Sequence, residues 1–419
     1  MLDIKRIREN TEEVKKALLK KMAPEDLDLE SIINLDDNRK SFTAELEQML
    51  AYRNKVSKTK PTPEIIAEVK ELGPKITAKK EELEKVEAEL LEKLGSLPNT
   101  PADDVVAGGK ENNEVIYTYG AKPEFSFEPK DHVELATSLG LIDYERATKM
   151  SGAGFWCYTG LGALIEWALL SYFIDFHTKN GYRFMIPPFL LTEKSAYTSG
   201  HLPKFRDELF WTQDGTCLNA TSEMMMGNYH REEILRGEDL PYKYCSYSAC
   251  FRREAGSYRQ EERGMIRGHQ FNKVEMFIFC RPEESWQMFD ELSANAQKLV
   301  EGLGLHYQLS KLAAEDCSAA MAKTYDVEVW IPSMNIYKEV SSISNALDYQ
   351  ARRGDTRFKD KTAASTEFVH TLNASGLATS RLIPALLEQF QQADGSVIIP
   401  EVLRQYLPFK ETVIKPIVK

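Results

Sequence analysis

Apolar side chains recur every three or four residues along two stretches in the first quarter of the chain. In the first stretch these positions are Leu35, Phe42, Leu46, Met49 and Val56. The second stretch repeats the spacing at Ile65, Val69, Leu72, Ile76, Leu83, Val86, Leu90, Leu94 and Leu97. Such spacing is typical of long amphipathic helices, and the short proline-bearing segment between the two stretches predicts antiparallel neighbours. We therefore expect a helical hairpin, an arm of roughly 40 Å at a rise of 1.5 Å per residue.

The remaining pattern divides the chain into three parts. A shorter amphipathic helix, ending near Lys21, precedes the hairpin, and together they make up a predicted domain over residues 1–105. Residues 106–122 contain two adjacent glycines and a polar run, which predict a linker. Strands and helices alternate over residues 123–419, which we expect to form the second domain. It includes a buried helix over 164–179 and a strand over 181–191 whose Pro187 and Pro188 favour an edge or interface position.

Composition indicates a soluble globular protein. The chain has 419 residues, enough for two or three domains, with 42% apolar and 28% charged residues. Its longest apolar run, Trp167 to Phe176, is interrupted by Asp175 and falls short of the 18 or more residues that a membrane helix needs. The N-terminus lacks the apolar segment of a secretory signal. We expect a cytoplasmic protein without a membrane partner.

Cysteine usage argues against a zinc site, and the net charge argues against a general nucleic-acid binder. The six cysteines form no C-x-x-C pair and the seven histidines show no metal spacing, so we expect buried thiols and no zinc site. A net charge of −11 is unusual for a general nucleic-acid binder, although it leaves room for a local basic stripe.

The most informative string is residues 251–257, FRREAGS, followed by residues 267–275, RGHQFNKVE. Arginine offers a rigid fork of donors that matches phosphate oxygens. Phe271 can stack on a purine ring, and Glu254 can accept a hydrogen bond from an exocyclic amine. These residues favour a nucleotide site. The alternative is a charged surface hairpin with ordinary cross-strand salt bridges.

The FRREAGS string resembles motif 2 of class II aminoacyl-tRNA synthetases, and the chain as a whole is similar to seryl-tRNA synthetases of the bacterial and eukaryotic type. The resemblance continues in order through residues 221–223, 322–330, 338–345, 349–353, 370–378, 391–396 and 400–404. It implies an α+β fold, in which an antiparallel β-sheet flanked by helices follows an N-terminal all-α coiled-coil arm. Residues 164–191 then correspond to motif 1 and to the interface of a homodimer.

The resemblance also implies an activity. Members of the family use ATP to activate L-serine to seryl-adenylate and transfer it to tRNA(Ser), and similar enzymes serylate selenocysteine tRNA where it exists. Because negative charge gathers on the phosphates in the transition state, positioning by arginine and Mg²⁺ dominates catalysis. By this mapping Arg252 holds the α-phosphate and the serine carboxylate, and Arg381 holds the far phosphates. We expect these two to be the catalytic residues.

The same mapping predicts the binding residues. The ATP pocket comprises Arg252, Arg253, Glu254, Arg267, Gly268, Phe271, Glu339, Val340, Ser341, Ser342 and Arg381. The serine pocket comprises Thr221, Ser222, Glu223, Arg252, Glu275, Asn373 and Ser375. Glu339 and Ser342 supply oxygen ligands for Mg²⁺, with phosphates completing the shell. Lys40, Arg53, Lys55, Lys75 and Lys79 of the arm are expected to contact tRNA phosphate and sugar. Without the family, they indicate only a solvated coiled-coil face.

Two departures from the family pattern stand out. The loop Ala314–Met321 lacks the glycines expected there, and Ser380 occupies a position where glycine is more usual. Neither change removes a predicted ligand. Two other functions are alternatives: a ligase that loads an amino acid onto a carrier protein, and a non-catalytic RNA-binding paralogue. The first kind lacks a long helical arm, and the second is expected to have lost its phosphate arginines, whereas this chain retains both features.

Overall fold

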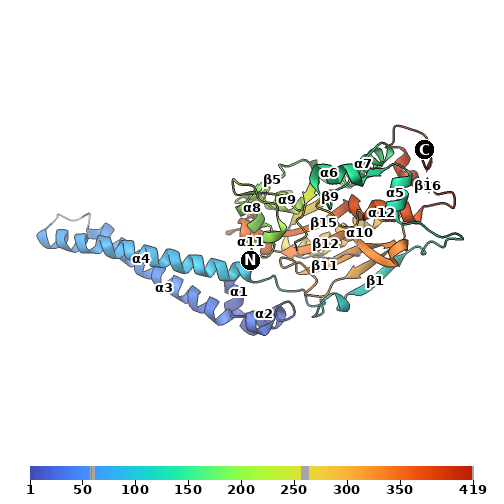
Figure 1. Ribbon diagram of the computed structural model, residues 1–419. Coiled ribbons are helices and arrows are strands. Elements are labelled where there is room, and N and C mark those ends of the chain that lie inside the picture. Colours follow the sequence, from blue (N-terminus) through green and yellow to red (C-terminus); the bar gives the residue numbers. More distant parts are fainter. Residues whose placement is uncertain (57, 59–61, 256–263, 418–419) are drawn as a thin grey trace. The chain divides into compact units, whose positions relative to one another are not determined.

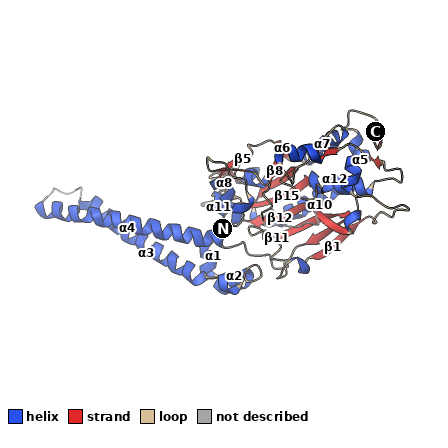
Figure 2. Ribbon diagram, in the orientation of Figure 1, coloured by secondary structure: helices blue, strands red, loops and turns tan. Residues whose placement is uncertain are grey.

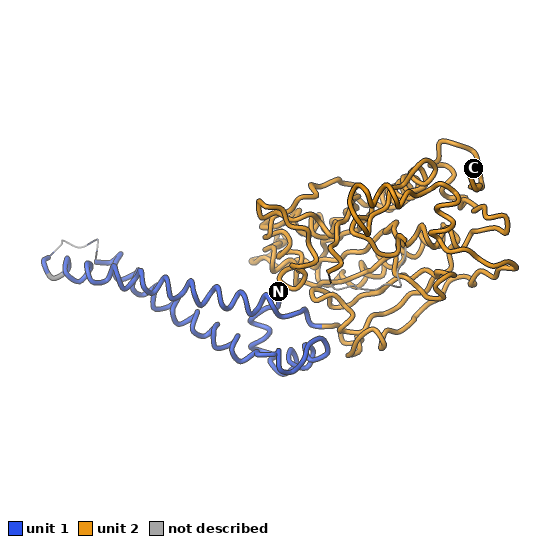
Figure 3. The backbone as a smooth tube through the Cα atoms, in the orientation of Figure 1, with its two compact units in different colours: residues 1–100 blue, residues 101–419 orange. Residues whose placement is uncertain are grey.

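A computed structural model describes residues 1–56, 58, 62–255 and 264–417. The chain forms two compact units, Met1–Thr100 and Pro101–Lys419, shown in separate colours in Figure 3. Residues 59–61 of the predicted turn over 58–63 and the last two residues of the 251–257 string lie outside the described residues. No helix in the described part of the chain is long and apolar enough to cross a membrane.

The N-terminal unit is all-helical. Two short helices, α1 (Ile4–Glu9) and α2 (Thr11–Leu18), replace the single early helix expected from the pattern, because the backbone leaves helical geometry at Asn10. They are followed by α3 (Leu29–Val56) and α4 (Pro63–Ser96), which run side by side as the predicted hairpin (Figure 1). The Thr62 hydroxyl caps α4 by accepting from the Ile65 amide at 3.3 Å.

The second unit is built on one eight-stranded sheet in the order β1-β10-β11-β12-β15-β9-β8-β4 (Figure 2). Neighbouring strands are antiparallel except that β4 runs parallel to β8. The strands are β1 (Glu114–Tyr119), β4 (Arg183–Met185), β8 (Tyr242–Phe251), β9 (Gln270–Cys280), β10 (Tyr307–Lys311), β11 (Lys323–Ile331), β12 (Ile336–Leu347) and β15 (His370–Ala378). The α+β class and the mainly antiparallel sheet are confirmed.

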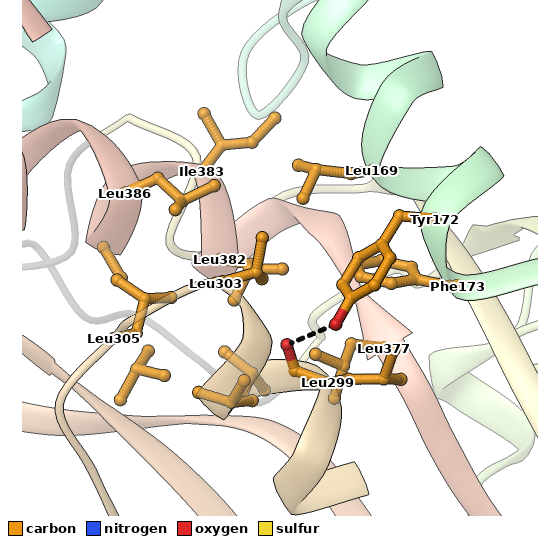
Figure 4. Close-up of a cluster of buried hydrophobic side chains, with 14 of the residues drawn as sticks. Leu169, Tyr172, Phe173, Leu299, Leu303, Leu305, Leu377, Leu382, Ile383 and Leu386 are labelled. Atoms are coloured by element: carbon orange, nitrogen blue, oxygen red, sulfur yellow. Dashed lines mark hydrogen bonds between the residues drawn. The ribbon is translucent and has the colours of Figure 1, made fainter. Parts of the chain in front are cut away.

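Three helices pack on this sheet through one large apolar core: α7 (Leu161–Lys179), α10 (Ser285–Gly302) and α12 (Thr379–Gln389). Figure 4 shows their side chains meeting, with Phe173 from α7 and Leu382 from α12 fully buried. The Tyr172 hydroxyl donates to the Leu299 carbonyl oxygen at 3.3 Å, so its polar end is satisfied inside the core. The core thereby anchors the first turn of α12 beside the sheet.

Smaller elements surround the sheet. The short helices are α5 (His132–Ser138), α6 (Tyr144–Ser151), α8 (Glu193–Thr198), α9 (Glu223–Met226), α11 (Tyr349–Gly354) and α13 (Glu401–Arg404). The short strands are β2 (Ile142–Asp143), β3 (Cys157–Tyr158), β5 (Leu190–Thr192), β6 (Thr216–Leu218), β7 (Ile234–Arg236), β13 (Arg357–Lys359), β14 (Glu367–Phe368), β16 (Val397–Ile398) and β17 (Val413–Ile414). All six cysteines are free thiols, and five of them are buried.

Two local predictions differ from the structure. Residues 106–122, expected as a linker, contain β1, the edge strand that pairs with β10. The segment 181–191, expected as one strand, forms β4 and β5 in different sheets, with Pro187 and Pro188 between them. Proline cannot donate to a strand ladder, so pairing stops there, while β4 takes the other edge of the large sheet.

Candidate active site

A cleft of about 570 Å³ lies over the central strands β9, β12 and β15 and adjoins a smaller one of about 50 Å³. The larger cleft is lined by Thr221, Glu223, Glu275, Asn373 and Ser375 from the predicted serine set. The smaller cleft is lined by Gly268, Phe271 and Val340, and both clefts share Arg252, Glu254, Arg267, Glu339 and Arg381. Motifs far apart in the chain are therefore brought to one place.

The deep end of the larger cleft is a buried network of polar side chains. Asn373 Nδ2 donates to Glu275 Oε1 at 3.2 Å and to Glu223 Oε2 at 3.4 Å. Gln350 Nε2, from α11, donates to the other oxygen of Glu223 at 2.6 Å. Thr221 Oγ1 donates to Glu275 Oε2 at 3.3 Å. Both carboxylates are therefore held in fixed orientations by neutral donors.

The two carboxylates of this network differ in their charged partners. Lys273 forms an ion pair with Glu275 and donates to Thr221 Oγ1 at 2.7 Å. Burial raises the pKa of Glu223 to about 7, and the nearby charge of Glu275 adds to the rise. A cation arriving beside Glu223 would favour its ionised form, so this end of the cleft suits an ammonium group.

Arg252 and Arg381 line both clefts. Arg252 follows the end of β8, donates from Nε to the Ala220 carbonyl oxygen at 3.3 Å, and lies with Cζ 5.2 Å from the Phe271 ring centroid. Arg381 lies in the first turn of α12, where a helix N-terminus favours anions. Its Nη1 donates to the Glu339 carbonyl oxygen at 3.0 Å. Two guanidinium groups that line one cleft suit a polyphosphate.

The smaller cleft is shaped by an ion pair and by a glycine. Glu254, at a φ of 51°, forms an ion pair with Arg267. A Cβ on Gly268 would clash with the Trp156 ring, so only glycine lets the backbone lie against that ring. Phe271, on β9, borders this space.

Oxygen ligands for a divalent cation converge beside Arg381. Glu339 on β12 has a side chain that is 42% exposed, and Ser342 faces Asp326 across the β11–β12 ladder. Burial, together with the charge of Glu339, raises the pKa of Asp326 well above its usual range, and its Oδ1 has no hydrogen-bond partner among the described residues. Within those residues no group of three or more His, Cys, Asp or Glu side chains could hold a metal by itself. The donor set fits Mg²⁺ if phosphate oxygens complete the shell.

Three predicted binding residues lie outside both clefts. Arg253 is exposed, and its backbone amide donates to the Glu208 carbonyl oxygen at 2.9 Å. Ser222 is fully buried and donates to Ser248 Oγ at 2.7 Å, and Ser341 is fully buried and donates to the Ser375 carbonyl oxygen. Arg253 and Ser341 contact residues that line the cleft, whereas Ser222 contacts Ser248, which does not. Ser380 lies inside α12 without a positive φ, so it needs no glycine there.

Several lining residues were missed from the sequence, among them His201, Lys273, Ser318 and Met321. The alternation of β9 could have found Lys273, because it points to the same face as Glu275. Ser318 and Met321 show that the loop lacking its usual glycines faces the cleft. Lost solvent contact and the charges of Arg252 and Lys273 lower the pKa of His201 to about 3, so its ring is neutral.

The predicted arm residues are of two kinds. Arg53, Lys55 and Lys75 are exposed. Lys40 forms an ion pair with Asp36 at 2.7 Å, and Lys79 pairs with Glu45 and Glu82 while lying over the Phe42 ring. The first three are available to a partner, whereas Lys79 joins the two helices of the arm.

Comparisons with known proteins agree with this architecture. Residues 1–101 match the family model of the seryl-tRNA synthetase N-terminal domain, and residues 205–390 match the tRNA synthetase class II core domain (G, H, P, S and T). The serine--tRNA ligase 2 of Clostridium acetobutylicum is 52% identical over 97% of this chain and 99% of its own. The chain belongs to the seryl-tRNA synthetase family.

Other members of the family support the fold as well as the sequence. The serine--tRNA ligase of Thermodesulfovibrio yellowstonii is 43% identical over 97% of this chain and 99% of its own. The crystal structure of seryl-tRNA synthetase from Pyrococcus horikoshii, complexed with ATP, covers 100% of both chains with a TM-score of 0.92 and 33% identity. That of the Naegleria fowleri enzyme with AMP covers 99% of both, with a TM-score of 0.87 and 30% identity. The clefts thus lie in a class II synthetase core.

Proposed function

We propose that the protein is an ATP-dependent serine–tRNA ligase, which activates L-serine to seryl-adenylate and transfers it to tRNA(Ser). The observation that carries this proposal is the larger cleft. It has a carboxylate-rich end at Glu223 and Glu275, and two arginines, Arg252 and Arg381, at the end that joins the smaller cleft. A zwitterionic amino acid and a nucleoside triphosphate are complementary to these two ends.

Serine is recognised at the deep end. Glu275 already has Lys273 as its cation, so Glu223 takes the serine ammonium. The remaining hydroxyl and amide groups of Thr221, Asn373 and Ser375 provide partners for the serine hydroxyl. Alanine would leave such buried groups unpaired, which is the physical basis for its rejection.

Activation takes place between the two arginines. The serine carboxylate attacks the α-phosphorus of ATP, the bond from that phosphorus to the bridging oxygen breaks, and pyrophosphate leaves. Arg252 holds the α-phosphate and the carboxylate in one bidentate fork, and Arg381 stabilises charge developing on the leaving pyrophosphate. Phe271 stacks on the adenine, and Glu254 accepts from its amine.

Glu339 and Ser342 would hold Mg²⁺ together with the ATP phosphates, and buried Asp326 lies beside them. When bound, the ion neutralises phosphate charge and orients the triphosphate. Among these groups, Ser342 hydrogen-bonds to Asp326, which keeps its hydroxyl oxygen oriented. The Glu339 side chain is 42% exposed and its Oε2 accepts from Arg381 Nη1 at 3.4 Å, so it would turn from that arginine toward an incoming ion.

The arm and a second subunit are part of the proposal. The exposed Arg53, Lys55 and Lys75 of α3 and α4 bind tRNA phosphate and sugar. A homodimer forms through α7, whose Leu161, Leu164 and Trp167 are 38%, 37% and 56% exposed although the rest of the helix is largely buried. Exposed apolar side chains on one helix face are typical of an interface.

ATP–pyrophosphate exchange with each of the twenty amino acids tests the activation half of the proposal. We expect strong exchange with serine and much weaker exchange with alanine, threonine and glycine. Exchange with alanine comparable to that with serine would contradict the serine pocket. Absence of exchange with every amino acid would instead favour a non-catalytic paralogue.

A further inference from the structure

A buried carboxylate of α7, unused in the steps above, lies between two segments that line the ATP pocket. Glu166 is 3% exposed, and its Oε1 accepts hydrogen bonds from Asn272 Nδ2 and from Thr379 Oγ1, both at 2.7 Å. Thr379 Oγ1 also lies 3.1 Å from the Asn272 carbonyl oxygen. One oxygen atom therefore joins three segments that are far apart in the sequence.

The two donors lie one and two positions along the chain from residues proposed to bind ATP. Asn272 follows Phe271 on β9, and Thr379 precedes Arg381 by two residues at the start of α12. Phe271 and Arg381 both line the smaller cleft. Sliding β9 against α12 would separate the adenine platform from the phosphate arginine, and a misplacement of about 1 Å can cost roughly 10²-fold in rate.

The network extends to the outer face of α7. The Tyr247 hydroxyl donates to Asn272 Oδ1 at 3.2 Å, and its ring lies 5.7 Å from the ring of Trp167, which is 56% exposed. The Asn272 side chain is thus fixed at both ends. A contiguous set of contacts links the exposed face of α7 to Asn272, next to Phe271 on β9.

Packing alone does not account for a carboxylate at this position. Burial raises the pKa of Glu166 to about 7, although hydrogen bonds from Thr379, Asn272 and Tyr158 act against the rise. An apolar side chain of similar size would dock α7 without the cost of desolvating a carboxyl group. The advantage of a carboxyl oxygen is that it accepts two hydrogen bonds at once and so fixes the distance between their donors.

We propose that Glu166 is a positioning residue for ATP, holding the adenine platform of β9 and the phosphate arginine of α12 at a fixed separation. The inference rests on the proposed function, since that assigns ATP to the smaller cleft. A glutamine retains one carbonyl oxygen for both donors and keeps the separation. A leucine removes the acceptor, so the separation between β9 and α12 is no longer fixed.

The test compares four variants by calorimetric titration with ATP alone, by KM for ATP and for serine in pyrophosphate exchange, and by thermal unfolding. They are Glu166→Leu, Glu166→Gln, Thr379→Val and, as a matched control, Glu388→Gln. Glu388 is also fully buried, and it accepts from His132 Nδ1 at 2.8 Å and Ser333 Oγ at 2.9 Å, away from the ATP pocket. Thr379→Val removes one of the two donors to Glu166 at nearly constant volume. It therefore tests the same hydrogen bonds if Glu166→Leu does not fold.

We expect Glu166→Leu to raise the KM for ATP about tenfold or more, as for a lost hydrogen bond to a buried charged group, with the KM for serine at saturating ATP nearly unchanged. Thr379→Val should act in the same direction, Glu166→Gln should largely restore ATP binding, and Glu388→Gln should affect only thermal stability. Folded variants at positions 166 and 379 that bind ATP as tightly as wild type would overturn the inference. A wild-type protein that binds ATP yet exchanges pyrophosphate with no amino acid would contradict the proposed function instead.

Discussion

At the scale of single residues, the charge balance of the serine pocket determines how serine affinity depends on pH. Two buried carboxylates share one lysine, and burial leaves Glu223 with a pKa raised to about 7. The ammonium of serine binds the ionised carboxylate, whereas a protonated Glu223 must first lose its proton. Serine affinity is therefore full only well above pH 7, is about halved at that value, and declines further as the pH falls below it.

This gives a pH prediction. The KM for serine in pyrophosphate exchange should rise roughly tenfold from pH 7.5 to pH 6, following protonation of a single group. Glu223→Gln should have a high KM that no longer depends on pH in this range, because the titrating group is gone. A wild-type KM that stays constant over these pH values would show that Glu223 does not receive the ammonium.

The phosphate clamp is tested by substitutions at position 252. Arg252→Ala should lower the rate of pyrophosphate exchange by about 10²-fold or more, by analogy with the loss of one preorganised donor. Arg252→Lys should recover little, since an ammonium cannot reproduce the planar fork. Arg253→Ala is the matched control, because this neighbouring arginine lies outside both clefts, and its exchange rate should be near that of wild type. Equal losses at positions 252 and 253 would argue against the clamp.

Sequence strings located most of the lining residues but not their packing. Arg252, Glu275 and Arg381 could be predicted because they lie in strings that the family shares. Lys273 and His201 were not, because a lysine beside Glu275 and a histidine in a loop have no function until the fold brings them to the cleft. Ser222 and Ser341 lie in the same strings as cleft residues, but their side chains point into the interior. A shared string does not reveal which way each of its side chains points.

At the scale of elements, the long helices of the arm could be predicted from the sequence, whereas the edge strand of the sheet could not. The long helices were predictable because their apolar spacing persists over 28 and 34 residues in α3 and α4. β1 was not, because a six-residue strand with mostly exposed side chains carries no alternation and is specified by pairing with β10.

The arm should serve transfer and not activation. The triple variant Arg53→Glu, Lys55→Glu and Lys75→Glu reverses three exposed charges, so serylation of tRNA should weaken and its salt dependence should flatten. Pyrophosphate exchange should be unaffected. Deletion of residues 34–97 with a short splice is the stronger version, and should abolish serylation while sparing exchange. Near-normal charging by the deletion variant would mean that the arm is only structural.

At the scale of the whole molecule, the exposed face of α7 predicts the assembly. Trp167→Glu places a charge among Leu161 and Leu164, and should convert a dimer to monomers, as measured by size-exclusion chromatography with light scattering. Trp286 on α10 is 41% exposed and serves as the control, since Trp286→Glu should leave the dimer intact. A monomeric wild-type protein, or a Trp167→Glu variant that remains dimeric, would rule out this interface.

The most direct test of the central claim is aminoacylation of total tRNA by the purified protein with ATP, Mg²⁺ and each amino acid, followed by identification of the charged species. We expect serine alone to be attached efficiently and to be found on tRNA(Ser). Efficient attachment of another amino acid, or serine activation without any transfer to tRNA, would contradict the claim.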